Sequence, residues 1–314
     1  MIISVAYDID LNDASCMKIL KQSFAPLKAA QQKYEQCDEV DTRRYHNFVS
    51  VTLVTAPSPT PAEVRLLASA SALLHESVGQ SSGYARIRGS LAAHPTLALF
   101  IKSRDKTGGD MWGKGVAQVD TTAELALGWL WTFLSYERTR AHTSAAKNLP
   151  RSEADIENSR SKIMTGAKKF PKGLGDRIFE NIWVWDKMQE SSGAYYYVLT
   201  FSPASEHEWA RKDLEAARNR TSSSLSLVKA TTKGVYKIRP IAPNICELTL
   251  VQCANFGGKL PAFVADANVA KGLLTLIQIQ TRFRRTDRVV DKVRGRGGPR
   301  AKPSQEPSQE QRCN

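Results

Sequence analysis

The spacing of apolar residues changes near the C-terminal end of the chain. Residues 246–253 alternate between apolar and polar side chains, which is typical of a strand with one face on a core. After Pro261 the apolar residues recur with a period near 3.6, which predicts an amphipathic helix from about Val264 to about Arg285. A further strand is predicted over residues 234–240. This region is therefore predicted to be a strand pair followed by a long helix that packs on an apolar surface.

The preceding two hundred residues are predicted to be rich in strands. The predicted strands cover residues 85–90, 97–102, 111–120, 161–168, 176–185 and 194–201, with a weaker strand over 221–230. In the strand 176–185, Phe179, Asn181, Trp183 and Trp185 share one face, and Ile178, Ile182 and Val184 share the other. Both faces are largely apolar, which indicates that this strand is buried on two sides.

Helices are predicted before and between these strands. Thr60 as N-cap, Pro61 at the first helical position and Glu63 in the first turn predict a helix from residue 61 to about 77. Thr121 and Glu124 have capping-box spacing, and the apolar helix predicted after them turns polar by residue 138. Residues 13–37 have weak helical spacing, residues 48–55 are β-prone, residues 56–61 read as a linker, and residues 206–220 as a short solvated helix or loop.

These elements together predict an α+β fold in which a curved antiparallel sheet is wrapped around the long C-terminal helix. The chain has 314 residues, of which 42% are hydrophobic, so it can form a sizeable core. Its net charge of +13 is compatible with nucleic acid, anionic lipid or simple solubility. No N-terminal leader pattern or membrane-spanning apolar run is present, which predicts a soluble cytoplasmic protein.

No motif in the sequence indicates catalysis, a cofactor or a metal. The five cysteines lack metal-binding spacing and, without a secretory leader, favour reduced thiols. The five histidines are scattered, and neither a GxSxG nucleophile elbow nor a glycine-rich nucleotide loop is found. We therefore expect a protein that is not an enzyme and that needs no cofactor.

Several segments resemble START domains, the steroidogenic-acute-regulatory-protein-related lipid transfer family. The resemblance lies in Arg239–Pro240 before a strand, the turn over residues 255–261 with Gly257-Gly258-Lys259-Leu260-Pro261, and the helix that carries Phe263, Leu273 and Phe283. Upstream it includes Trp112-Gly113-Lys114-Gly115 and the strand that follows a proline-containing loop, 177–185. It covers about residues 84–291. It implies a helix-grip fold with a tunnel for one hydrophobic molecule between the sheet and the C-terminal helix.

The linker near residue 60, the resemblance over residues 84–291 and the composition of the tail together divide the chain into four parts. Residues 1–60 form an N-terminal extension of uncertain structure, 61–83 a leading helix, 84–291 the START-like domain and 292–314 a disordered basic tail. In the tail, Arg294, Arg296, Arg300 and Lys302 could contact an anionic membrane transiently. The arginine–glycine texture also permits weak RNA contact, but we expect no specific nucleic acid. A plain solubilising role is favoured for the tail.

A cavity of this kind needs apolar side chains, and a few polar groups that orient a head group. The candidates for lining it are Trp183, Trp185, Tyr195, Tyr197, Arg239, Leu248, Leu250, Leu276, Ile277 and Gln280. Each of the apolar candidates could instead be a packed core residue, and Arg239 could instead lie on the rim, an interpretation that is slightly favoured. Gly257 and Gly258 are better explained by turn geometry than by phosphate binding.

The favoured function is a non-enzymatic lipid-binding or lipid-transfer module, a monomer that holds one lipid or sterol-like ligand and sits at membranes peripherally. The alternative is a START-like interaction or regulatory domain whose cavity is occluded by Trp183, Trp185 and Tyr197. A third and weaker reading is a cyclase-like enzyme, which would need acids or histidines converging in the cavity. Apart from Arg239, the polar residues predicted to face the cavity are Asn181 and Gln280.

Overall fold

The structure is a computed structural model that describes residues 38–79, 84–86, 96–102, 110–146, 149–157, 159–220, 226–258 and 260–284. The predicted helix 13–37 and the basic tail 292–314, with its four predicted membrane-contact residues, lie outside the described residues. No helix of the described part is long and apolar enough to cross a membrane.

In the described part of the chain, nine strands form one twisted sheet. Its order is β1-β2-β3-β9-β8-β7-β6-β5-β4, and neighbouring strands are antiparallel. The strands are β1 (Tyr84–Arg86), β2 (Leu97–Lys102), β3 (Met111–Val119), β4 (Arg151–Asp155), β5 (Ser161–Lys168), β6 (Arg177–Gln189), β7 (Tyr195–Pro203), β8 (Val228–Ala242) and β9 (Ile245–Asn255). One short parallel pairing joins β6 to the start of β8.

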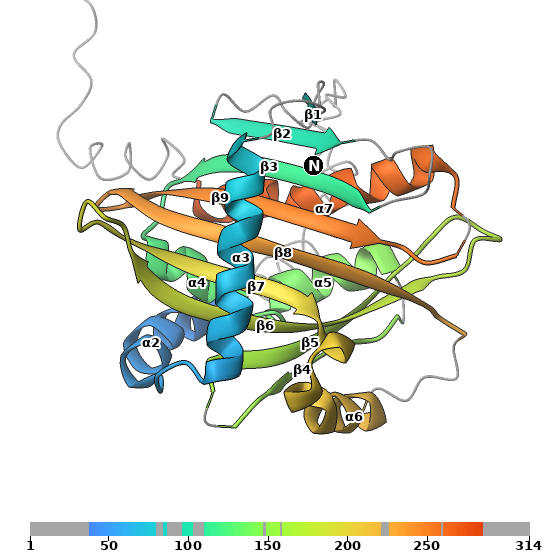
Figure 1. The fold of residues 1–314 in the computed structure, drawn as a ribbon, viewed down its shortest axis with the longest axis horizontal. Coiled ribbons are helices and arrows are strands. Elements are labelled where there is room, and N and C mark those ends of the chain that lie inside the picture. Colours follow the sequence, from blue (N-terminus) through green and yellow to red (C-terminus); the bar gives the residue numbers. More distant parts are fainter. Residues whose placement is uncertain are drawn as a thin grey trace, which may run out of the picture.

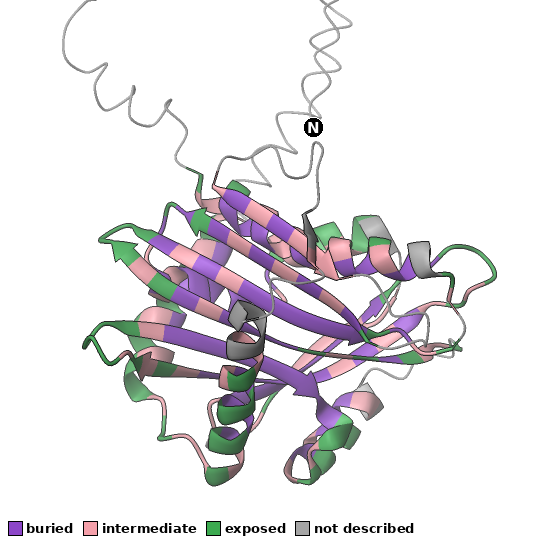
Figure 2. Ribbon diagram, turned by 45° about the horizontal axis from the view of Figure 1, so that its top comes forward, coloured by how far each residue is buried: buried purple, intermediate pink, exposed green. Residues whose placement is uncertain are grey.

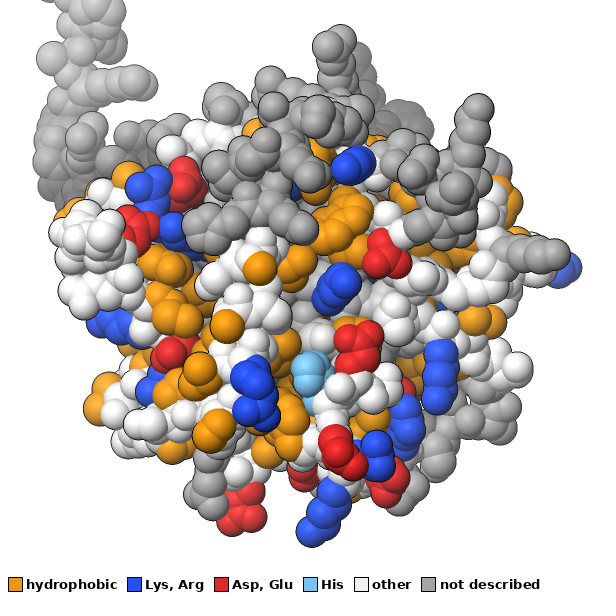
Figure 3. All heavy atoms as spheres, viewed as in Figure 1, with side chains coloured by type: hydrophobic (Ala, Val, Ile, Leu, Met, Phe, Trp, Pro, Cys, Tyr) orange, Lys and Arg blue, Asp and Glu red, His pale blue; other side chains and the backbone are white. Residues whose placement is uncertain are grey.

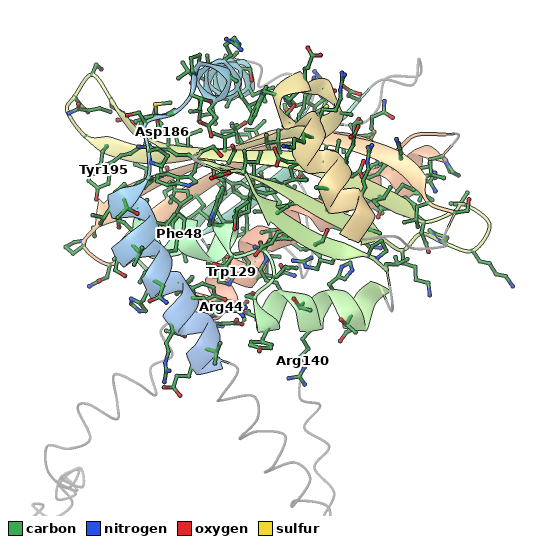
Figure 4. The ribbon with its side chains drawn as sticks, turned by 90° about the horizontal axis from the view of Figure 1, so that it is seen from below. Arg44, Phe48, Trp129, Arg140, Asp186 and Tyr195 are labelled. Atoms are coloured by element: carbon green, nitrogen blue, oxygen red, sulfur yellow. The ribbon has the colours of Figure 1, made fainter. Side chains whose placement is uncertain are left out.

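Helices cover both faces of this sheet (Figures 1 and 4). On one face lie α3 (Pro61–Gly79) and α6 (Arg211–Arg220), which follows two short 3-10 turns, Ala204–Glu206 and Glu208–Ala210. On the other face lie α4 (Ala123–Trp131), α5 (Tyr136–Ala146), α7 (Ala262–Phe283) and a helical segment over residues 38–55. The predicted α+β helix-grip architecture is therefore confirmed by the strand order and by the position of α7.

The two faces of β6 explain why the sheet needs both helical layers. Ile182 and Val184 are fully buried in the cluster that includes α3 and α6. Trp183 and Trp185 point to the opposite face, into the larger cluster beneath α4 and α7. Figure 2 shows buried residues continuing along the central strands, while the ends of several strands are more exposed. The predicted burial of this strand on both sides is confirmed.

The start of α7 depends on the glycine turn that precedes it. Gly257 and Gly258 both have φ +63°, a region that side chains rarely adopt, and a Cβ on Gly257 would lie 2.5 Å from the carbonyl oxygen of Lys229. The backbone N–H of Gly257 donates to Asn255 Oδ1 at 3.0 Å, and Arg177 Nε donates to the carbonyl of Phe256 at 3.1 Å. The two glycines thus serve turn geometry, as predicted.

Close contact between α7 and the sheet depends on glycines in β3. A Cβ on Gly113 would lie 2.8 Å from Val269 Cγ1, and one on Gly115 would lie 2.4 Å from Leu276 Cδ1. Because these positions lack a side chain, α7 lies directly against β3. The sequence Trp112-Gly113-Lys114-Gly115 therefore fixes the depth at which the C-terminal helix packs.

The β-prone reading of residues 48–55 is wrong. They are helical, with a π-helical turn over Phe48–Thr52 followed by Leu53–Thr55. Phe48 packs its ring 5.7 Å from that of Trp185, whereas Val51 and Val54 face solvent. Burial of one aromatic stripe on the sheet therefore overrides the strand propensity of the β-branched residues.

Three further element predictions need correction. The N-cap of α4 is Thr122, whose Oγ1 accepts from the N–H of Leu125 at 3.3 Å, one residue after the predicted cap Thr121. That helix ends at Trp131, and the polar residues after it form the separate helix α5. The weak strand predicted over 221–230 belongs, from residue 228, to the long strand β8. The strand β4 went unpredicted because its sequence, Arg-Ser-Glu-Ala-Asp, is polar.

Candidate ligand-binding cavity

A cavity of about 530 Å³ lies between the sheet, α5 and α7. Its floor comes from β5 to β9, one side from α5 and the other from α7. Residues 38–55 and α4 cover the neighbouring part of the same sheet face, where the side chains are close-packed. The cavity therefore occupies one end of the space between the sheet and the helices on this face.

Aromatic rings form its inner wall. Trp183 stacks on Phe201 with ring centroids 4.6 Å apart, and Tyr236 lies 6.2 Å from Trp183. The other apolar lining comes from all sides of the cavity: Trp129, Phe133, Ala141, Met164, Gly166, Ala167, Phe179, Ala254, Phe256, Val269, Gly272 and Leu274. This wall offers a molecule the apolar contact that removes hydrocarbon from water, worth about 25 cal/mol per Å².

Helix α5 places three polar side chains in the cavity, Glu137, Arg138 and His142. Arg138 donates to the carbonyls of Trp129 and Leu130 at 3.2 and 2.9 Å, and its guanidinium lies over the Trp129 ring. Burial lowers the pKa of Arg138, raises the pKa of Glu137 and lowers the pKa of His142. Each shift disfavours the charged form, so this side of the cavity is poorly solvated.

Two polar atoms at the cavity wall are buried without a hydrogen-bond partner among the described residues, Arg151 Nε and Asn181 Oδ1. Arg151 comes from β4 and donates through Nη2 to the Phe133 carbonyl at 2.6 Å, with its guanidinium 3.6 Å from the centre of the Phe133 ring. Burial, together with the charge of Arg138, lowers the pKa of Arg151 to about 9. A buried polar atom without a partner is costly, so both atoms are candidates for contact with a ligand.

Exposed residues mark the mouth of the cavity between α5 and α7. These are Ala141 on α5, Lys168 and Lys169 at the end of β5, and Lys271 and Gln278 on α7. Lys168 at the end of β5 and Lys271 on α7 line this mouth from two sides. The mouth is thus basic.

Side-chain amides hold α7 over the sheet. Gln252 Nε2 donates to the carbonyl of Val269 at 3.2 Å, and the same amide fills the space beside Gly272. Further along, Gln280 Nε2 donates to the Gln118 carbonyl at 2.7 Å and to Thr96 Oγ1 at 3.1 Å. These bonds attach the helix to β9 and β3 on either side of the contact at Gly115.

Of the ten predicted site residues, Trp183 is placed in the cavity wall. Asn181, which was predicted to face the cavity without being counted among the ten, also lines it. The other nine lie outside the lining: Trp185, Tyr195, Tyr197, Arg239, Leu248, Leu250, Leu276, Ile277 and Gln280. The structure places them elsewhere, for physical reasons that differ between groups.

The apolar members of this group lie in or against the packed core. Trp185, Tyr197, Leu248, Leu250 and Leu276 are buried in the cluster beneath α4 and α7, and Ile277 packs against it. The hydroxyls of Tyr195 and Tyr197 both donate to Glu124 Oε1 at 3.1 Å, at the end of the sheet beside α4. These residues meet α4, residues 38–55 or β3 rather than the cavity.

The two polar residues among these nine, Gln280 and Arg239, form contacts within the fold and do not line the cavity. Gln280 makes the bonds to Gln118 and Thr96 described above. Arg239 is exposed and pairs with Glu247 on the neighbouring strand at 3.0 Å, which agrees with the rim reading. An exposed pair of this kind is worth about 0 to 1 kcal/mol.

The residues that sequence reasoning missed lie mainly on polar segments. Glu137, Arg138 and His142 lie where the predicted helix turns polar, and Arg151 lies in a polar segment for which no strand was predicted. On α7, the cavity side carries Asn268, Lys271, Thr275 and Gln278, whereas the most apolar stripe packs on β3. The prediction took the most apolar face of α7 as the cavity side, but that face packs in the core.

Comparison with models of protein families gives no match, and comparison with curated proteins gives none either. Solved structures do match at low identity. The lipid transfer and protein localization domain of human StarD13 is 14% identical, with 69% of this chain and 96% of that one covered and a TM-score of 0.45.

Two more solved structures are similar. For human StAR-related lipid transfer protein 5 the identity is 11%, the coverage 70% and 97%, and the TM-score 0.46. For the STAR-related lipid transfer protein of Xanthomonas axonopodis these values are 10%, 65% and 100%, and 0.45. TM-scores below 0.5 carry no weight here, so the fold assignment rests on the strand order and on the packing of α7.

Proposed function

We propose that this chain is a non-enzymatic lipid-binding module that holds one hydrophobic ligand between its sheet and α7. The observation that supports this most is the cavity of about 530 Å³ with the aromatic wall of Trp183, Phe201 and Tyr236. Its volume lies within the about 300 to 1,000 Å³ of pockets that hold one small molecule. Its basic mouth would let a polar head group remain near solvent while the apolar part packs on the rings.

The occluded-domain alternative requires the cavity to be filled by the protein's own aromatic residues. Trp185 and Tyr197 are packed elsewhere, and Trp183 stands in the wall of the cavity. The cyclase-like reading would use Glu137 and His142. However, Glu137 accepts from Trp129 Nε1 at 3.4 Å, and His142 Nε2 lies 3.2 Å from the Leu149 carbonyl oxygen. The positions of these aromatic residues and the hydrogen bonds of Glu137 and His142 both support ligand binding over the two alternatives.

Loading from vesicles tests the proposal. The full chain is incubated with vesicles made from a mixed cellular lipid extract, separated from them and analysed by native mass spectrometry. We expect one added lipid mass per protein molecule, and transfer of that lipid to acceptor vesicles. A protein that leaves the vesicles without any bound lipid would contradict the proposal.

We also propose that the basic residues Arg294, Arg296, Arg300 and Lys302 bring the domain to anionic membranes. Their contribution would be about 1 kcal/mol per residue near the surface and would fall with salt. Replacing all four with Gln should reduce binding to vesicles containing phosphatidylserine, without changing the amount of lipid already loaded.

A further inference from the structure

The charges of the residues that line the cavity are unbalanced. Among the described residues, the lining contains five basic side chains, Arg138, Arg151, Lys168, Lys169 and Lys271, and one acidic side chain, Glu137. On the opposite face of the sheet, around α3 and α6, basic and acidic side chains are interspersed (Figure 3). The excess of positive charge is therefore a feature of the cavity and not simply of the whole basic chain.

The carboxylates that act electrostatically on the two arginines, Glu153 and Glu137, also pair with other cations. Glu153 Oε2 lies 3.5 Å from Lys162 Nζ, and Glu137 Oε2 lies 3.8 Å from Arg282 Nε. Among the ion pairs formed by the described residues, none includes Arg138 or Arg151. The positive charge of the two guanidinium groups is left without a full counter-ion.

The two guanidinium groups also share one aromatic ring. The Arg138 and Arg151 Cζ atoms lie 5.4 and 3.6 Å from the centre of the Phe133 ring. The charge of Arg138 contributes, after the larger effect of burial, to the lowered pKa of Arg151, which reflects repulsion between the two guanidinium groups. A bound anion between them would relieve it.

One hydrogen-bond donor and one acceptor at the wall have no partner among the described residues. Arg151 Nε is a buried donor, and Asn181, whose side chain is buried to more than nine-tenths, has a buried Oδ1 without a hydrogen bond. Both residues line the cavity, together with Arg138 and the aromatic wall. An oxyanion can accept from the guanidinium, and a hydroxyl can bind to the amide of Asn181.

We propose that the ligand of this cavity is a single-chain amphiphile with an oxyanion head group, a carboxylate or a phosphate, bound by Arg151 and Arg138. This proposal rests on the proposed function and specifies its ligand class. The apolar chain packs on Trp183, Phe201 and Tyr236, and Lys168 and Lys271 attract the anion to the mouth. Guanidinium groups suit this role because their planar donors match the oxygens of both anions.

Equilibrium dialysis of the full chain with three ligands that share the same cis-monounsaturated hydrocarbon chain tests this. The ligands are oleate, oleoyl lysophosphatidate and the uncharged oleyl alcohol, at concentrations below micelle formation. We expect at least one of the anions to bind about tenfold more tightly than the alcohol or better, a difference of about 1.4 kcal/mol. The anion that binds more tightly identifies the head group as a carboxylate or a phosphate.

Two variants locate the anion. Arg151→Gln should weaken binding of the preferred anion about tenfold and leave binding of oleyl alcohol unchanged, which also shows that the cavity is intact. Arg140→Gln is the matched control, because Arg140 is exposed on the same helix as Arg138 and points away from the sheet (Figure 4). It should change neither affinity.

The possible failures are distinguishable. Equal affinity for the alcohol and both anions, or an Arg151→Gln variant that binds the anion like the unchanged protein, would overturn the anionic head group and leave the lipid-binding function standing. Failure to bind any of the three ligands would overturn the proposed ligand class, and it would overturn the lipid-binding function as well only if the vesicle experiment also yields no bound lipid.

Discussion

Trp183 and Trp185 lie two residues apart on the same face of β6, yet they have different neighbours. Trp185 is covered by residues 38–55, with the Phe48 ring 5.7 Å away, and is 2% exposed. Trp183 has Phe201 and Tyr236 beside it and borders the cavity. The difference arises because the N-terminal helical segment and α4 cover one end of this sheet face, while α5 and α7 leave a space over the other.

Residues 38–55, which fall within the predicted N-terminal extension 1–60, bond to other elements of the structure. Asp41 is buried and accepts from the backbone N–H groups of Tyr136 and Glu137, both at 2.9 Å. It thus caps the first turn of α5 from another element. Arg282 near the end of α7 forms an ion pair with Asp38 and bonds to Thr42 at 2.7 Å. The segment joins the two helices that flank the cavity.

The largest expected effect is on the free energy of unfolding, and it should differ between substitutions of the two tryptophans. Trp185→Ala should lower the free energy of unfolding by about 3 to 5 kcal/mol, because it leaves a void in a close-packed region. Trp183→Ala should cost less, about 1 to 3 kcal/mol, because one side of that ring already faces the cavity. Urea denaturation of both variants measures this. An equal loss would contradict the distinction between the two ends.

The second largest loss of stability should follow from removing Asp41, which caps the first turn of α5. Asp41→Ala leaves two backbone donors at the start of α5 without their acceptor, so we expect a loss of about 2 kcal/mol in the free energy of unfolding. Glu39→Ala is the matched control, since Glu39 is on the same segment and forms an exposed pair with Arg43. It should change stability by less than about 0.5 kcal/mol. Similar losses in the two variants would mean that residues 38–55 do not brace α5.

Filling the cavity should affect binding more than stability. Thr275→Phe places a ring in the cavity from α7 and should weaken binding of oleyl alcohol about tenfold, with little change in the unfolding midpoint. Thr281→Phe makes the same substitution at an exposed position of the same helix. If both variants bind the alcohol like the unchanged protein, the ligand lies elsewhere.

The smallest effect concerns pH. Burial raises the pKa of Glu137 above its usual 4.5, so the folded state holds this proton more tightly than the unfolded state. Stability from this group is fully present below pH 4.5 and is lost as the pH rises through the raised folded pKa. We expect the stability difference between Glu137→Gln and the unchanged protein to shift in favour of the variant over this window. Urea titrations from pH 4.5 to 8 measure it, and a difference independent of pH would count against the buried position.

The sequence predicted the framework because periodicity reports burial. The alternation along β6 located both of its faces, and the glycine turn before α7 was predicted from residue types that permit positive φ. It could not predict the cavity, because a buried side chain has the same pattern whether it meets another side chain or a space. Trp183 and Trp185 are indistinguishable in sequence for this reason.

The polar lining was missed for a second reason. Arg138 and Arg151 come from segments whose polarity suggested solvent exposure, and their burial depends on how α5 and β4 fold back over Phe133. Such long-range placement leaves no local signal. Asn181 was the exception, because a polar residue in an otherwise apolar strand face is visible in the sequence.

Photocrosslinking tests the contrast between the two ends of the sheet most directly. The full chain is loaded with oleyl alcohol that carries a diazirine in its chain, irradiated and digested, and the modified residues are identified by mass spectrometry. Our account predicts modification of cavity residues such as Met164, Phe201 and Tyr236. Modification of Tyr45, Phe48 or Trp185 instead would place the ligand in the region that we describe as packed, and would contradict it.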